Sequence, residues 1–433
     1  MLNALKRLIG IDTGLVLAAM GIIATSVYVL NTAIVSPDGG AQHDFAIRQV
    51  VFAAIGFCIA FGVSRVPLET WTRYWVHALV IAVTGVVAVR FVGTVVNGSR
   101  RWLDLGPISL QPSEFGKWLA LIALAGYLGS RTREIRSPRV FAGALGMMAI
   151  PAGVVFLQPD FGTAQVYGFL ALGTLFFAGA KWLHFAILGG GVVVVAVVIL
   201  GLLPALGVEV LHDYQIKRLT GFLDPEADSQ GSNYQTIQAK VAIGSGQLTG
   251  RPADEASQVQ QGFLPEPQTD FIFATLVERY GFLGGAFVLG LYMLLISRIL
   301  AVVGSASTQY GRLIAGGVAT LFFCQVVVNV GMVVGVLPVT GVPLPMFSYG
   351  GSALWTNMAA LGLVVAVLRE SETPRARYTK RTGRPVGGFG SLRATSGEKR
   401  AASGARSSIG ALSGGSASRS SLRAASRRRQ RAR

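Results

Sequence analysis

Charged residues are scarce in this chain of 433 residues. Only 14% of them are Asp, Glu, Lys or Arg, whereas an ordinary soluble domain has about 25%. Hydrophobic residues make up 52% of the chain, and the mean hydropathy is +0.54. So few charged side chains cannot cover so much apolar surface in water, which excludes a soluble globular protein.

Cysteine and histidine are also rare. The two cysteines, Cys58 and Cys324, lie far apart within long apolar runs, which leaves neither a disulfide framework nor a CxxC metal site. The four histidines show no HxxxH or HExxH spacing, so the familiar zinc-binding patterns are missing. Redox and zinc chemistry are therefore poor hypotheses for this sequence.

Acidic residues are outnumbered by basic ones, 21 against 38, which gives a net charge of +17. From Arg369 onward, 17 basic residues oppose 3 acidic ones, a net charge of +14, and the preceding residues carry only +3. Because the excess belongs to a tail, we expect no nucleic-acid partner. Residues 370–433 are rich in Gly, Ser, Ala and Arg, a composition that cannot form a core and predicts a disordered cytoplasmic tail.

Long apolar runs are what the chain has instead. A membrane-spanning helix needs about 20 mostly apolar residues. Ten segments meet this requirement, near residues 13–35, 46–64, 72–92, 112–129, 140–157, 161–180, 182–206, 270–297, 311–335 and 352–369. We expect an all-α polytopic integral membrane protein over residues 1–369. A large outer loop at 207–269, with a helical stretch at 233–243, separates the seventh and eighth spans.

The distribution of Lys and Arg among the short loops predicts the orientation. Basic residues at 6–7, in the loop 131–139 and in the tail lie on one side of the predicted spans, which the positive-inside rule assigns to the cytoplasm. Both termini are then cytoplasmic. Arg48, Arg101 and Lys117 lie on the opposite side and run against this trend, which indicates that positive charge is needed there.

The first candidate site lies at the outer entrance to the fourth span, in the motifs NGSRRW and QPSEFGK. Glu114 and Lys117 are three residues apart, so they share one face of a helix. The spacing fits two interpretations. One is an ion pair that neutralises itself within the membrane, and the other is an anion or metal pocket to which Arg101 adds charge.

Two aspartates stand where predicted spans begin. Asp160 lies in the motif QPDFGT and Asp270 in LPEPQTDFIFA. An aspartate is a favoured N-cap, because its carboxylate accepts hydrogen bonds from the free amides of the first turn. A charge at the membrane edge is also a candidate for function. Spacing alone does not decide between cap and catalyst.

The segment LPVTGVPLPMFSYGGS, residues 337–352, is too rich in Pro and Gly for a helix and too apolar for a free loop. Non-helical backbone at membrane depth is tolerated only where it is buried in protein or lines a wet cavity. We expect a re-entrant or tightly folded outer segment. It either packs between the last two spans or contacts a ligand, and Ser348 is the candidate contact.

In this order, the motifs NGSRRW, QPSEFGK, QPDFGT, LPEPQTDFIFA and LPVTGVPLPMFSYGGS resemble the SEDS family (shape, elongation, division and sporulation), typified by RodA and FtsW. The resemblance extends from about Asp12 to Arg369, and VTGVPLP is more similar to RodA. It implies a peptidoglycan glycosyltransferase on the outer face of the cytoplasmic membrane. Such an enzyme polymerises lipid II into β-1,4 glycan strands, with inversion, for cell elongation and shape.

The resemblance also implies roles for individual residues. Asp270 matches the family's essential aspartate, which acts as the base for the acceptor hydroxyl or binds a divalent cation, Mg²⁺ or Mn²⁺. Glu114 and Lys117 complete the catalytic set, and Glu114 is a second tentative metal ligand. The candidate substrate-binding residues are Arg48, Arg101, Trp102, Asp160 and Ser348. The cations would stabilise charge on the departing pyrophosphate, and Trp102 would either stack on a sugar or anchor the chain at the interface.

Partners and alternatives follow from the same resemblance. The family works with a class B penicillin-binding protein, whose transmembrane helix we expect against the span that begins at Asp270 and the span that follows. The alternatives are a flippase or transporter for lipid-linked precursors, a scaffold for the cell-wall machinery, and the division paralogue of the same polymerase. A transporter needs charges along a path to the cytoplasm, whereas the acidic residues outside the tail gather mostly on the outer side.

Overall fold

The computed structural model describes residues 12–33, 42–96, 99–104, 106, 109–206, 234–252 and 255–372. Residues 1–373 form one compact unit and residues 374–433 a second. The predicted tail, and residues 207–233 of the predicted outer loop, lie outside the described residues.

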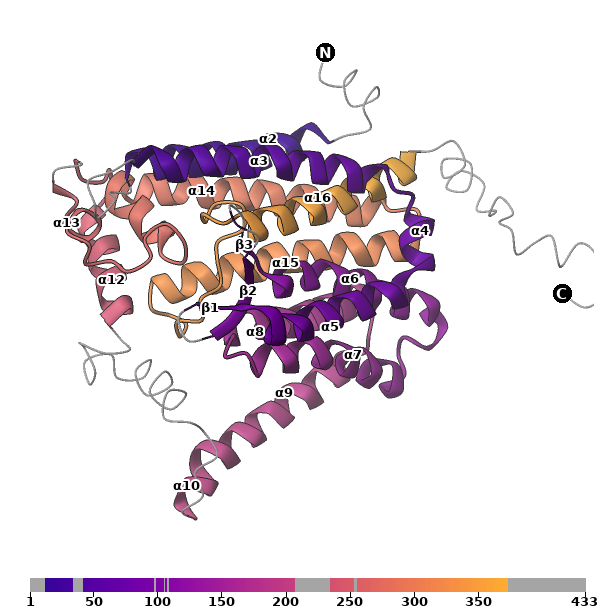
Figure 1. Cartoon of the computed structure of the whole chain (residues 1–433). Coiled ribbons are helices and arrows are strands. Elements are labelled where there is room, and N and C mark those ends of the chain that lie inside the picture. Colours follow the sequence, from indigo (N-terminus) through magenta and orange to yellow (C-terminus); the bar gives the residue numbers. More distant parts are fainter. Residues whose placement is uncertain are drawn as a thin grey trace, which may run out of the picture. The chain divides into compact units, whose positions relative to one another are not determined.

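Helices dominate the first unit (Figure 1). The long ones are α2 (Thr13–Thr32), α3 (Gln42–Arg65), α5 (Trp75–Val92), α6 (Pro112–Ser130), α7 (Pro138–Phe156), α8 (Phe161–Ala178), α9 (Trp182–Val197), α14 (Ile272–Ser305), α15 (Gln309–Val333) and α16 (Gly351–Glu372). The short ones are α4 (Leu68–Arg73), a 3-10 turn (Thr132–Glu134), a π-helical turn (Val198–Leu202), α10 (Leu203–Ala205), α12 (Tyr234–Gly246) and α13 (Ser257–Gln260). The helix α12 confirms the helical stretch predicted in the outer loop.

Nine helices among the described residues are long and apolar enough to cross a membrane, which confirms the polytopic all-α prediction. The predicted fourth span, 112–129, is also a long helix, α6, but it is not one of the nine. The polar residues of its first two turns, Glu114 and Lys117 among them, lower its hydropathy. The helix α6, which is too polar to be counted with the nine, carries the candidate pair Glu114 and Lys117.

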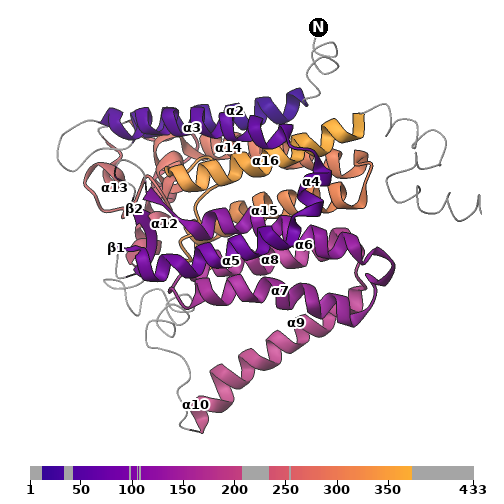
Figure 2. The same cartoon turned by 45° about the vertical axis from the view of Figure 1, so that its right-hand side comes forward.

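The long helices run back and forth side by side, and the two ends of the bundle differ (Figures 1 and 2). We call the end that holds Asp12, α4 and Glu372 the terminal end. The opposite end holds α12, α13 and the strands, and we call it the strand end. At the centre, α15 and α16 are mostly buried, whereas α9 has no buried residue and leaves the bundle in both views.

The helix α14 is broken at Gly281, whose φ of 66° and ψ of −169° are not helical. A straight helix of 34 residues would be about 51 Å long, well beyond a hydrocarbon core of about 30 Å. At the break, the amides of Phe282 and Leu283 donate to the carbonyls of Gln247 and Leu248, at 2.8 and 3.1 Å. The chain after α12 thus pairs the groups that the kink frees, and holds the start of α14 at the strand end.

Three short strands, which the sequence analysis did not predict, form an antiparallel sheet of order β1-β2-β3. They are β1 (Thr94–Val96), β2 (Ser99–Asp104) and β3 (Ser109–Leu110). Val95 pairs with Arg100, and Leu103 pairs with Leu110. Strands of two to six residues are too short for a clear alternating pattern. Their effect is to hold part of the NGSRRW motif across the entrance to α6.

Candidate active site

All the candidate residues lie at the strand end (Figure 1). Glu114 and Lys117 are in the first two turns of α6, Asp160 precedes α8, Asp270 precedes α14, Ser348 precedes α16, Arg48 is in the second turn of α3, and Arg101 and Trp102 are in β2. The sequence scatters them over 301 positions, from 48 to 348. The fold brings them to one end because the chain reverses direction between successive spans.

Glu114 and Lys117 form a buried ion pair. The Lys117 Nζ lies 2.6 Å from Glu114 Oε1, and the two side chains are 1% and 3% exposed. This confirms the ion-pair interpretation. The second carboxylate oxygen, Oε2, is buried and makes no hydrogen bond within the described part of the chain. The pair neutralises itself but leaves hydrogen-bonding capacity on both partners.

Asp160 both caps a helix and joins three elements. Its Oδ1 accepts a hydrogen bond from the amide of Thr163 at 3.1 Å, which caps α8. Its Oδ2 accepts one from Gln111 Nε2 at 3.2 Å, just before α6, and lies 3.7 Å from the Arg101 guanidinium on β2. The capping interpretation is therefore correct, and the second oxygen holds Arg101 beside the entrance to α6.

Asp270 is not a helix cap. Phe271 occupies the N-cap position of α14, and no side chain there accepts a hydrogen bond from the free amides of the first turn. The pKa of Asp270 is raised to about 6, mainly by burial and further by the negative charges of Glu266 and Asp160, while the positive charge of Arg101 opposes the rise. Asp270, Asp160 and Arg101 thus share one electrostatic environment, in which a carboxylate titrates close to neutral pH.

Asn329, on α15, holds the backbone at Asp270. Its amide Nδ2 donates to the carbonyl of Asp270 at 2.9 Å and to that of Val342 at 2.8 Å. The side chain is fully buried, and its Oδ1 makes no hydrogen bond within the described residues. Sequence analysis missed this residue, although an amide within the apolar span 311–335, whose only side-chain amides are those of Gln325 and Asn329, was a usable signal.

The segment 337–350 folds tightly against the start of α14, as expected of a buried non-helical stretch. The Ser348 hydroxyl donates to the carbonyl of Thr269 at 2.7 Å and accepts from the amide of Leu344 at 2.8 Å. The side chain is 3% exposed. Its hydroxyl therefore positions backbone, and the structure does not favour the predicted substrate contact.

Two glycines allow this segment to approach its neighbours. A Cβ on Gly162 of α8 would lie 2.2 Å from the carbonyl oxygen of Thr340, closer than any packed pair of atoms. Gly341 has a φ of 72°, and a Cβ there would lie 3.4 Å from Asp270 Oδ2. The segment thus forms the wall between α8 and the carboxylate of Asp270.

Arg48 and Trp102 lie at the same end, and among the described residues their side chains are not part of this hydrogen-bond network. Arg48 is exposed on α3, and Trp102 is partly exposed on β2. The backbone carbonyl of Trp102 accepts a hydrogen bond from the Thr94 hydroxyl at 3.2 Å. Their roles in substrate binding stay predictions.

The fit to a divalent cation is partial. Within the described residues, no three His, Cys, Asp or Glu side chains are grouped so as to hold a metal. Glu114 is bound to Lys117, whereas Asp270 lies in the field of two other carboxylates. Mg²⁺ is usually held by one or two carboxylates together with substrate phosphates. The residues fit a cation that a phosphate-bearing substrate helps to bind.

Comparison with known proteins adds to this geometry. The family model of FtsW, RodA and SpoVE, described as a cell cycle protein, matches residues 9–373. The peptidoglycan glycosyltransferase MrdB of Escherichia coli K12 is 37% identical over 350 residues, which cover 80% of this chain and 92% of MrdB. The stage V sporulation protein E of Bacillus subtilis is 38% identical over 331 residues, 76% of this chain and 87% of that protein.

Solved structures agree. A chain from a study of how a peptidoglycan synthase complex coordinates polymerization and crosslinking superposes with a TM-score of 0.70 at 32% identity, over 84% of this chain and 98% of that one. The rod shape determining protein RodA of Thermus thermophilus gives a TM-score of 0.62 at 28% identity, over 85% and 99%. With the motifs, the fold and these matches in agreement, this chain belongs to the FtsW/RodA/SpoVE family, the SEDS family that its motifs resemble.

Proposed function

We propose that this protein is a peptidoglycan glycosyltransferase that polymerises lipid II into β-1,4 glycan strands for cell elongation and shape. The observation that carries the proposal is Asp270, a carboxylate with a pKa of about 6 beside the Arg101–Asp160 ion pair. The glycosyltransferase names of several relatives support it. One site then holds a base together with cations for a pyrophosphate.

In the proposed reaction, a sugar hydroxyl of the acceptor attacks the anomeric carbon of the donor. A C–O bond forms on one face while the C–O bond to the pyrophosphate breaks on the other, which inverts the configuration. Asp270 takes the hydroxyl proton. A base whose pKa lies near the working pH is both deprotonated and strong enough to accept that proton.

The leaving pyrophosphate carries the negative charge that develops, and fixed cations stabilise it. Arg101 is 27% exposed, so its guanidinium is reachable from the strand end. Lys117 has three donor protons, and Glu114 takes one of them. A divalent cation, Mg²⁺ or Mn²⁺, held by Asp270 and by substrate phosphates, would neutralise further charge.

The proposed orientation puts the strand end outside the cytoplasmic membrane and both termini inside. The cations of the short loops support it through the positive-inside rule. For the class B penicillin-binding protein, we propose a docking surface on α14 and α15. Apolar side chains on α14 support this, since Phe282, Phe287 and Met293 are 58 to 73% exposed.

The test is polymerisation of lipid II by purified protein with Mg²⁺ or Mn²⁺, read as glycan strands on a gel. Asp270→Asn should abolish the strands. Asp104→Asn, which changes an exposed carboxylate on β2, is the matched control and should keep them. A folded Asp270→Asn protein that polymerises normally would remove Asp270 from the role of base. Translocation of a labelled precursor in proteoliposomes, without polymer, would favour the flippase.

A further inference from the structure

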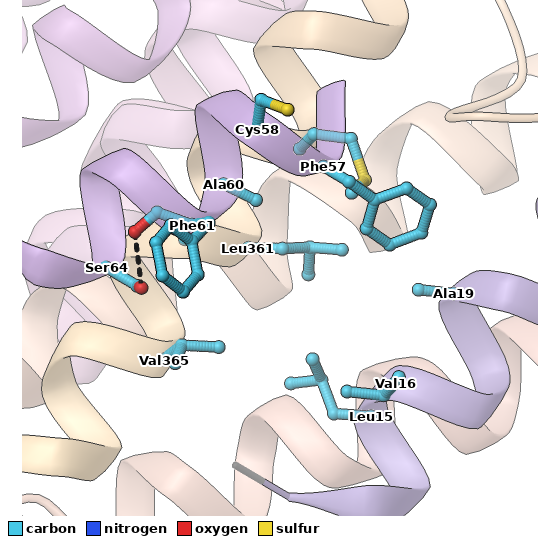
Figure 3. Close-up of a pocket in the computed structure, with 12 residues that line it drawn as sticks. Leu15, Val16, Ala19, Phe57, Cys58, Ala60, Phe61, Ser64, Leu361 and Val365 are labelled. Carbon is cyan, nitrogen blue, oxygen red and sulfur yellow. Dashed lines mark hydrogen bonds between the residues drawn. The ribbon is translucent and has the colours of Figure 1, made fainter. Parts of the chain in front are cut away.

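A second feature lies at the other end of the bundle. A cavity of about 490 Å³ opens between α2, α3 and α16 near the terminal end. Figure 3 shows side chains from the three helices facing one space, among them Leu15, Ala19, Phe61, Leu361 and Val365. Apart from Cys58 and Ser64 its lining is apolar. Nothing in the proposed reaction uses it.

The cavity opens outward. Cys58 is exposed and Phe61 is 58% exposed at its mouth, whereas Leu15 and Leu361 on its floor are buried. The Ser64 hydroxyl donates to the carbonyl of Phe61 at 2.7 Å, so the cavity offers little to a polar ligand. Around spanning helices, such a mouth faces the hydrocarbon of the bilayer.

Cations stand where the cavity meets the terminal end. The Arg65 guanidinium lies over the Phe61 ring, 4.3 Å from its centroid, and Arg369 Nη1 donates to the carbonyl of Ser64 at 3.0 Å. Two carboxylates, Glu69 and Glu370, also lie at this end, where their like charges repel each other. The carboxylate of Asp12 accepts a hydrogen bond from the amide of Leu15 at 3.1 Å, but Arg298 neutralises it. The two arginines, Arg65 and Arg369, are the cations that contact lining residues of α3.

We propose that this cavity binds one acyl chain of an anionic phospholipid, with the phosphate of its headgroup at Arg65 and Arg369. On α3 the lining runs from Phe57 to Ser64, about 10 Å along the helix axis, which suits the upper part of a chain that enters from the headgroup level. Basic sites between spanning helices are suited to anionic headgroups. The leaflet is the cytoplasmic one in the orientation proposed above.

The experiment uses the full-length protein in nanodiscs with phosphatidylglycerol or phosphatidylcholine that carries a photoactivatable group in its acyl chain. Mass spectrometry identifies the crosslinked peptides. We expect crosslinks on α2, α3 and α16 around the cavity, with a preference for phosphatidylglycerol of about fivefold per arginine. Arg65→Gln should lower that preference about fivefold, and Arg73→Gln, an exposed arginine at the same end, should not.

Filling the cavity is the second arm. Ala19→Phe should remove most of the crosslinking, whereas Ala301→Phe, at an exposed position on α14, should not. Because Ala19 is buried and its variant could misfold, Cys58→Trp, at an exposed position, narrows the mouth without changing the core. Crosslinks elsewhere, equal yields for the two lipids, or an unchanged yield after both blocks would overturn the proposal. So would a Cys58–Cys58 disulfide formed by oxidation, which would show a second copy at the mouth.

Discussion

The two ends of the bundle use charge in opposite ways. At the strand end, Glu114, Lys117 and Asp160 are buried and bound to one another or to neighbouring polar groups. At the terminal end, Arg65 lies exposed beside an apolar cavity. Burial makes a charge expensive and therefore dependent on its partners, whereas an exposed cation is free to meet a membrane surface. The difference separates a reaction site from a lipid contact.

One ion pair at the terminal end sharpens this comparison. The Arg298 guanidinium binds the carboxylate of Asp12, which caps α2, and the Arg298 side chain is 35% exposed. Lys117 in its pair with Glu114 is 1% exposed. Both carboxylates are buried, Asp12 at 7% and Glu114 at 3% exposed, so the two pairs differ in the access of the cation to water.

The largest expected effect is on catalysis at the strand end. Asp270→Asn removes the proposed base, and general-base catalysis contributes about 100- to 10,000-fold to rate. We expect a loss of polymerisation in that range, measured as initial rates with saturating lipid II, while thermal stability is kept. No substitution in the terminal-end cavity, Ala19→Phe included, should approach this loss in a protein that folds. Equal losses at the two ends would refute the division of roles.

The next effect is on stability. Lys117→Met leaves the Glu114 carboxylate buried without its partner, which costs about 3–5 kcal/mol. Arg298→Gln should cost less, because Arg298 is 35% exposed and the Asp12 carboxylate keeps its hydrogen bond from the amide of Leu15. Thermal unfolding in detergent measures both. The double variant Glu114→Gln with Lys117→Met should regain most of the lost stability but stay inactive, and a double variant as unstable as the single one would contradict this account.

These pairs also show what the sequence could predict. The spacing of Glu114 and Lys117 predicted a shared helix face, and the spans and motifs predicted the family, because both depend on local pattern. The interactions of Asp160 with Gln111 and Arg101 join residues from three separate segments. No local pattern encodes such a contact, and the same holds for the terminal-end cavity, which exists only where three helices meet.

The next effect is on the position of the base, at Asn329, whose uncharged amide holds the backbone beside Asp270. Asn329→Leu leaves the carbonyls of Asp270 and Val342 without their donor, at about 1–3 kcal/mol for each. We expect kcat to fall more than KM changes, because Asp270 is displaced while the substrate contacts remain. Asn329→Asp, which removes the amide donor but keeps the shape, should fail as well. A rise in KM alone would assign Asn329 to binding.

The smallest effect concerns pH. Because a base works only when deprotonated, polymerisation should rise with pH through a midpoint of about 6, the pKa of Asp270, and level off above it. Glu266 raises this pKa through its negative charge, so Glu266→Gln should move the midpoint to lower pH. Asp104→Asn is the control and should leave it in place.

The raised pKa of Asp270 affects the stability of the folded protein in the opposite direction, because stability falls as pH rises. The folded protein binds the Asp270 proton more tightly than an ordinary carboxyl with a pKa of 3.8. This group therefore favours folding most at low pH, and its contribution is lost as pH rises through about 6. Between pH 3.8 and about 6, polymerisation should therefore rise with pH, while the contribution of Asp270 to the free energy of unfolding falls. If Glu266→Gln moved the two curves in different directions, Asp270 would not be the group that titrates.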